Sequence, residues 1–193
     1  MAFKQVMNYI YLPVQVTASY AINLLPAPAL LKLFCMNKNT PKPANRFTAI
    51  LTTMLIAGTL DIALAFLYNY VKYNILPGAI LQYIATTAFG KGSLGPEMAM
   101  FVGLLVHYAM ALVWVSLYFI VYPKVNLFRS QPFIAGIFYG FFVWCMMNLL
   151  LLPLWTGKPV PNMNANALFN MLILIVAIGL PPAFGAKRYY RHT

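Results

Sequence analysis

Acidic residues are nearly absent from this sequence, because Asp61 and Glu97 are the only two among 193 residues. The sequence therefore offers no carboxylate pair for general acid–base catalysis. It also contains neither a nucleophile elbow nor a phosphate loop of the P-loop type. Charged residues of both signs amount to only 8% of the chain, whereas soluble domains have about a quarter. The composition excludes a soluble globular protein.

Potential metal and redox ligands are equally scarce. Cys35 and Cys145 are isolated from each other and predict small buried apolar residues rather than a disulfide. A metal site or a bis-histidine haem needs more ligands than His107, since the other histidine, His192, lies in the C-terminal tail. We therefore expect no metal, no cofactor and no enzymatic activity. An enzyme acting on lipid would have only His107 and Asp61 to work with.

Long apolar segments dominate instead, and hydrophobic residues make up 62% of the chain. A span of the hydrocarbon core needs about 20 apolar residues. Four segments meet this length, and they predict an all-α integral membrane bundle with short interfacial helices, in which residues 46–193 form the transmembrane domain. The predicted spans cover about 47–70, 97–122, 132–152 and 166–184.

Proline and glycine mark the ends of the predicted helices. Pro153 is expected to close the third span, and the Pro181–Pro182 pair to bend or end the fourth. Residues 79–89 are too few to span and predict an interfacial helix that starts near Pro77 and is capped by Gly90.

Residues 1–45 are interrupted by proline and polar residues, and we interpret them as a membrane-interfacial segment. Two alternatives remain open here. Residues 6–25 are apolar enough for a fifth span, and Lys4 before an apolar run is also typical of a cleaved signal peptide.

The formal charge of +11 is explained by topology. Lysine and arginine cluster at the ends of the apolar segments and form no stripe on a helix face, so nucleic-acid binding is not predicted. Ten of them fall on one side of a four-span protein and three, Lys72, Lys91 and Lys158, on the other. The positive-inside rule then predicts that both termini are cytoplasmic.

Polar side chains within the spans are expected to meet in one layer. Counted from the same membrane face, Asp61 in the first span and His107 in the second lie at similar depth. Asn148 near the end of the third span, and Asn166 and Asn170 at the start of the fourth, fall in the same half. Asp61, His107, Asn148 and Asn170 form the predicted intramembrane polar cluster.

Small residues predict where the helices approach closely. Gly58 shares the face of Asp61, Gly103 shares the face of His107, and Gly136 and Gly140 form a GxxxG pattern in the third span. The same GxxxG pattern would be a candidate surface for dimerisation.

Asp61 has three interpretations. It could be structural, with Asp61 and His107 satisfying each other or nearby amides; it could handle a proton or ligand; or it could bind a partner. A hydrogen bond inside a membrane protein contributes on average about 0.6 kcal/mol, whereas a central charge costs about 2.5 to 3.5 kcal/mol. A lone aspartate is thus a poor way to stabilise a bundle, and this comparison favours a functional role.

Several short motifs resemble a known family. They are Gly58-Thr59-Leu60-Asp61, Leu81-Gln82-Tyr83-Ile84-Ala85, Leu104-Leu105-Val106-His107-Tyr108, Tyr139-Gly140 and Met147-Asn148. Over about residues 47–185 the chain resembles the YagU-like family of small bacterial inner-membrane proteins. The resemblance implies a four-span protein of the bacterial inner membrane. It marks Asp61, His107 and Asn148 without assigning them a reaction.

Two functions follow as expectations. The first is a non-enzymatic accessory or scaffolding subunit of a larger membrane complex, because the sequence shows no catalytic constellation and little mass outside the membrane. Its partners would be the lipid bilayer and other integral membrane subunits or further copies of itself. The alternative is a small oligomeric proton-coupled carrier or channel-like protein that uses Asp61 and His107.

Overall fold

The computed structural model describes residues 45–90, 92, 94–157, 159 and 163–191. This part is helical and contains no strand. Four helices in it are long and apolar enough to cross a membrane: Arg46–Tyr73, Pro96–Lys124, Pro132–Thr156 and Ala165–Arg191. The predicted all-α class with four spanning helices is confirmed. The alternatives for the N-terminal segment, and also Cys35 and His192, concern residues outside the described part.

The first span, α3 (Arg46–Tyr73), has a polar cap at each end. The Asn45 side chain accepts a hydrogen bond from the Thr48 backbone N–H at 2.8 Å, which satisfies one of the free donors at a helix start. Asn74 ends the helix because its backbone is left-handed, with φ of 53°.

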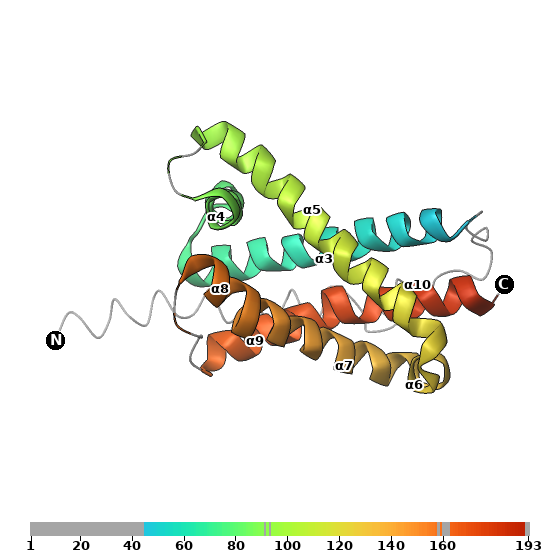
Figure 1. Ribbon diagram of the computed structural model, residues 1–193. Coiled ribbons are helices and arrows are strands. Elements are labelled where there is room, and N and C mark those ends of the chain that lie inside the picture. Colours follow the sequence, from blue (N-terminus) through green and yellow to red (C-terminus); the bar gives the residue numbers. More distant parts are fainter. Residues whose placement is uncertain (1–44, 91, 93, 158, 160–162, 192–193) are drawn as a thin grey trace, which may run out of the picture. The chain divides into compact units, whose positions relative to one another are not determined.

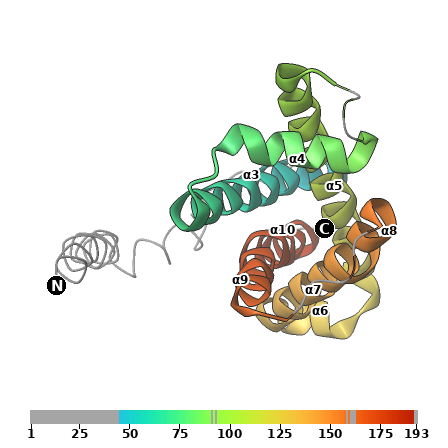
Figure 2. The same ribbon diagram turned by 90° about the vertical axis from the view of Figure 1, so that its left-hand side faces the viewer.

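A short helix, α4 (Pro77–Phe89), follows and packs on α5 (Pro96–Val121). Gly90, with φ of 87°, ends it. In Figure 1, where α3 and α10 run lengthwise across the view, α4 is seen end-on, and Figure 2 shows it lengthwise. The axis of α4 therefore runs across the spanning helices. This is the orientation expected of a helix that lies in the plane of the membrane, as the sequence predicted for this segment.

The third and fourth spans each contain a π-helical turn directly before their prolines. The third span runs through α7 (Pro132–Cys145), the turn η2 (Met146–Leu151) and α8 (Leu152–Thr156). The fourth runs through α9 (Ala165–Leu174), the turn η3 (Ile175–Gly179) and α10 (Leu180–Arg191). The second span consists of α5 and the 3-10 turn η1 (Tyr122–Lys124), and the short α6 (Asn126–Ser130) lies between the second and third spans.

The third span was predicted to end at Pro153, which is wrong, because its helix continues to Thr156. The fourth span continues past Pro181–Pro182 to Arg191, so of the two predicted outcomes, a bend or an end, the end is wrong. The Leu152 N–H bonds to the Met147 carbonyl, and the Leu180 N–H bonds to the Ile175 carbonyl, five residues back in each case. Each π turn places its prolines in the first turn of the next α segment, where a missing N–H costs little.

The buried core lies toward one end of the bundle. We call the half in which α3 begins and α10 ends the basic half, and the other the opposite half. The main core cluster lies in the basic half or at its boundary: Ala49, Met54, Ala57, Ala111, Trp114, Val115, Tyr118, Phe119, Tyr122, Tyr139, Val143, Ala177, Ile178, Ala183 and Ala186. The other buried hydrophobic side chains among the described residues are Ala135 in the basic half, Trp144 at the middle of the third span, and only Ile62, Ala85, Ala99 and Ala167 in the opposite half. The opposite half is therefore less tightly packed.

Candidate functional site: the Asp61–His107 layer

Asp61 lies near the middle of α3, at the boundary between the two halves. Its side chain is half-buried. Within the described part of the chain its carboxyl makes no hydrogen bond. A carboxyl at this depth is therefore left without a donor from the rest of the described bundle.

His107 on α5 is held by the backbone of α3. Its Nε2 lies 2.8 Å from the Gly58 carbonyl oxygen. Because a carbonyl oxygen can only accept, Nε2 must carry the proton of this bond. The neutral ring then leaves Nδ1 as an acceptor, and the charged ring makes Nδ1 a second donor.

The carboxyl of Asp61 and the ring of His107 interact electrostatically. They form no direct hydrogen bond among the described contacts. Of the structural interpretation, the form in which Asp61 and His107 bond to each other is not seen among the described contacts, whereas His107 is satisfied by the backbone carbonyl of Gly58. Asp61 and His107 do lie in one layer, where the sequence placed them.

Gly58 makes this layer possible because the ring of Tyr108 lies directly against it. A Cβ at Gly58 would come within 3.0 Å of Tyr108 Cδ1 and within 3.3 Å of Ala111 Cβ. The Tyr108 hydroxyl shares a hydrogen bond of 2.8 Å with Thr59 Oγ1. Thr59 is exposed, so this polar contact reaches the outer surface of the bundle.

The two asparagines of the predicted cluster are not joined to this layer by any described interaction. Asn148 is half-buried in η2, and its amide donates to the Trp144 carbonyl of its own helix at 3.1 Å. Asn170 on α9 is exposed. The structure thus brings together Asp61 and His107 but leaves Asn148 and Asn170 apart from them.

Comparison with known proteins gives no match. No family model, no curated protein and no solved structure matches this chain.

The other predicted packing glycines lie where helix backbones touch within the chain. A Cβ at Gly103 would be 2.0 Å from the Leu81 carbonyl of α4. A Cβ at Gly140 would be 2.4 Å from Ile175 Cα, and one at Gly136 would be 3.1 Å from the Gly179 carbonyl. The GxxxG pattern therefore packs α7 on η3 and is not a free surface for dimerisation.

A second polar cluster, which the sequence reasoning missed, lies at the far end of the opposite half. Lys72 donates to Asn166 Oδ1 and, at 3.2 Å, to the Tyr68 hydroxyl. Its Nζ lies 5.4 Å from the ring centroid of Tyr68, 5.6 Å from that of Tyr73 and 6.0 Å from that of Phe169. This cluster ties α3 to α9. The spacing of Tyr68 and Lys72, four residues apart on one helix face, was the available signal.

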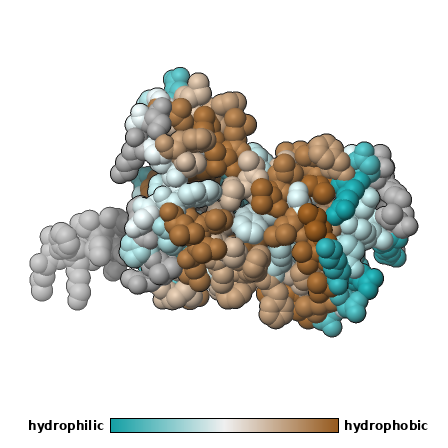
Figure 3. Space-filling model, viewed as in Figure 1, coloured by the Kyte–Doolittle hydropathy of each residue, from teal (hydrophilic) through white to brown (hydrophobic). Residues whose placement is uncertain are grey.

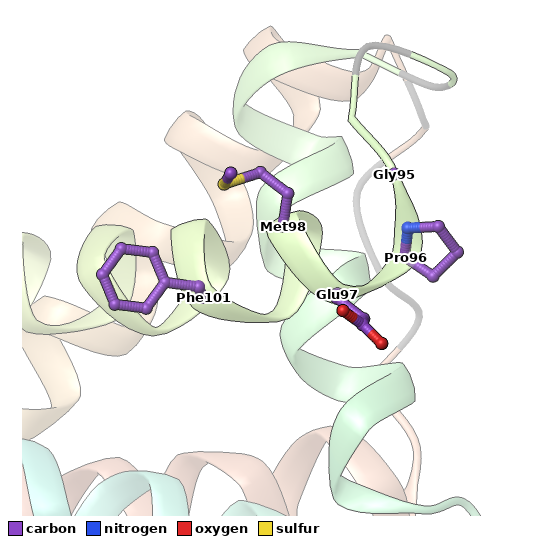
Figure 4. A pocket seen from close by; sticks show the side chains of 5 residues that line it. All are labelled: Gly95, Pro96, Glu97, Met98 and Phe101. Carbon is purple, nitrogen blue, oxygen red and sulfur yellow. The ribbon is translucent and has the colours of Figure 1, made fainter.

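Glu97, the other acid, lies on the first turn of α5, where the helix dipole favours a negative charge. A shallow hollow of about 750 Å³ surrounds it, lined by Gly95, Pro96, Glu97, Met98 and Phe101. Figure 4 shows the side chains of Glu97, Met98 and Phe101 pointing in different directions from the helix. The hollow lacks the converging polar groups of a ligand site. In the described part of the chain, histidine, cysteine, aspartate and glutamate also form no group of three suited to a metal ion.

Proposed function

We propose that this protein is a non-enzymatic accessory or scaffolding subunit of a larger membrane complex, and that the surface around Asp61 docks a helix of another subunit. The observation that carries the proposal is the Asp61 carboxyl, which lies at mid-span, half-buried and without a hydrogen-bond donor in the described chain.

The energetics favour a donor supplied from outside. A carboxylate at the centre of a span costs about 2.5 to 3.5 kcal/mol on insertion scales. Lipid tails cannot offset this cost, because they donate no hydrogen bonds. A transmembrane helix that presents a lysine, arginine, histidine or amide side chain at the same depth can do so. We therefore expect the partner to carry such a donor.

The packing around Asp61 agrees with this proposal. The opposite half of the bundle has few buried residues, so its inward helix faces are only partly covered. Thr59 and Leu105, close to Asp61 and His107 in sequence, are exposed. Polar and apolar groups are thus both available to an incoming helix, the combination by which helices associate in membranes.

The carrier alternative draws on the electrostatic interaction between Asp61 and His107. A carrier also needs a polar path to both sides. Buried side chains such as Trp114, Val115 and Phe119 fill the basic half, between Asp61 and the end of the bundle where α3 begins. Thr53, also buried there, donates to the Ala49 carbonyl of its own helix at 2.7 Å. The chain alone therefore supports docking better than transport.

A flux measurement in proteoliposomes distinguishes a carrier from a docking subunit. A carrier would show pH-dependent flux that Asp61→Asn removes. The docking proposal expects the purified chain to give no flux above empty liposomes, with or without the substitution.

Location and orientation belong to the same proposal. We propose a bacterial inner membrane, as the resemblance described above implies. We propose that both termini are cytoplasmic because the described cations gather in the basic half: Arg46, Lys124, Arg129, Lys187, Arg188 and Arg191. Cysteine labelling from outside intact cells tests this. We expect a membrane-impermeant reagent to reach Met98→Cys and not Lys187→Cys.

Cross-linking tests the docking surface directly. A photo-reactive residue at Thr59 should join the chain to one other protein in a fixed ratio, and Asp61→Leu should abolish the product. The same residue at exposed Phe138 on α7 is the matched control and should not give that product. If Thr59 cross-links only within its own chain, or if Asp61→Leu leaves the product unchanged, the docking proposal is wrong.

A further inference from the structure

We propose that the basic end of the bundle holds the phosphate group of an anionic phospholipid, bound between Arg46 and Arg129 beside the stacked rings of Tyr122 and Tyr190. This site lies at the other end of α3 from Lys72 and does not involve Asp61, so it is independent of the proposed docking function.

Charge balance is the first argument. The described part of the basic end carries six cations, namely Arg46, Lys124, Arg129, Lys187, Arg188 and Arg191. The only two acids of the whole sequence are elsewhere, since Asp61 is in the middle of α3 and Glu97 is at the start of α5. In Figure 3, hydrophilic residues gather at the right-hand end of the view, beside a largely hydrophobic middle. Arg46 and Arg129 have no carboxylate partner among the described residues, which favours an anionic ligand at this end.

Arg46 and Tyr190 both donate to the backbone carbonyl oxygen of Phe119, which has no N–H donor from its own helix. Phe119 lies in the last turn of α5, and the residue four positions later is Pro123, which has no N–H to donate. Arg46 donates to the Phe119 carbonyl at 3.0 Å, and the Tyr190 hydroxyl donates to the same oxygen at 3.0 Å. The guanidinium of Arg46 is thus oriented through one nitrogen while its remaining donors stay available.

Arg129 approaches the same place from α6. The ring of Tyr122 stacks on that of Tyr190, with centroids 5.1 Å apart. Arg129 interacts electrostatically with Tyr122, and its guanidinium donates to the Asn126 side chain. Both arginines are exposed. Two oriented guanidinium groups therefore lie next to one aromatic stack.

The chemistry of these groups selects a phosphate. Guanidinium is planar and presents paired N–H donors that match two phosphate oxygens, and a tyrosine-rich border is typical of the headgroup level of a membrane. Arg46 begins a helix long enough to span, and Arg129 lies on the short α6 that connects two such helices, so we expect both at the level of the lipid phosphates. The ligand class is accordingly an anionic phospholipid rather than nucleic acid or a soluble anion.

The experiment uses the purified full chain in a neutral detergent. We measure lipid binding by native mass spectrometry and the thermal midpoint while adding phosphatidylglycerol, phosphatidylcholine or inorganic phosphate. We expect phosphatidylglycerol alone to bind and to raise the midpoint. An equal rise with phosphatidylcholine, or with inorganic phosphate, overturns the assignment to an anionic lipid.

Paired variants test the site itself. Arg46→Gln combined with Arg129→Gln should weaken phosphatidylglycerol binding about thirtyfold, since two cations near the lipid surface are lost. Lys124→Gln combined with Lys187→Gln removes the same charge at the same end and should weaken binding less than fivefold. Arg129→Gln alone keeps the Arg46–Phe119 bond, and should weaken binding about fivefold even if the double variant folds poorly. Equal losses in the two double variants, or no loss in Arg129→Gln, would overturn the proposed site.

Discussion

His107 on α5 donates a hydrogen bond of 2.8 Å to the backbone carbonyl of Gly58 on α3. This bond joins two spans near the centre of the bundle. Asp61, one turn along α3 from Gly58, has no described hydrogen bond to the histidine or to any other described residue. The histidine has a structural partner within the chain, whereas the carboxyl does not.

The His107–Gly58 bond predicts a specific cost. His107→Leu removes the donor and should lower the free energy of unfolding by about 1 kcal/mol. His107→Gln keeps an amide donor and serves as the control, with a smaller loss. Unfolding by SDS in mixed micelles measures both. Equal stability of His107→Leu and the unchanged protein would show that the bond contributes nothing.

Asp61 should behave differently from His107 in the isolated chain. Asp61→Leu removes a polar group that no described residue satisfies, so the purified protein should keep its stability or gain up to about 2 kcal/mol. Exposed Leu67→Ala on the same helix is the control and should change little. The same SDS titration gives the answer. A loss above about 1 kcal/mol would mean that Asp61 is bonded within its own chain.

Close backbone packing predicts a large effect at Gly140. A Cβ there would lie 2.4 Å from Ile175 Cα, so Gly140→Ala must push α7 away from η3. We expect a loss of about 1 to 3 kcal/mol or misfolding. Gly95→Ala is the matched control, because a Cβ at Gly95 meets nothing within 4 Å. Thermal midpoints of the two variants in one detergent should differ clearly, and similar midpoints would contradict the packing.

The carbonyl of Phe119 predicts a coupling between Pro123 and Tyr190. Tyr190→Phe removes one donor and should cost about 0.5 to 1.5 kcal/mol. Pro123→Ala restores a backbone N–H that can bond to the same oxygen, so Tyr190→Phe should cost less in that background. A double-mutant cycle measures the difference. Additive effects would show that the freed carbonyl is not what holds Tyr190.

The sequence predicted the spans well because length and hydropathy alone decide whether a helix can cross a membrane. It also placed Asp61 and His107 at one depth, since counting residues along antiparallel helices is reliable. It did not predict how the helices pass Pro153 and Pro181, because the π turns depend on a local shift of the hydrogen-bond ladder.

Contacts across helices were harder to predict. Nothing in the sequence shows that His107 would choose the Gly58 carbonyl over Asp61, because every helix carbonyl is a possible acceptor. The exposure of Asn170 depends on the rotation of α9, which residue counts leave open. The Phe119 carbonyl was predictable in principle, since Pro123 four residues later marks a free acceptor, but its donors come from distant parts of the chain.

The most direct test of the central claim is the mass and composition of the particle extracted from its own membrane in a mild detergent or nanodisc. We expect the 21.7 kDa chain to travel with a larger membrane partner in a fixed ratio. Asp61→Leu should release the partner, and Asp61→Asn, whose amide can still bond, should retain most of it. A chain that travels alone or only with copies of itself, or a partner that Asp61→Leu leaves bound, would contradict the account.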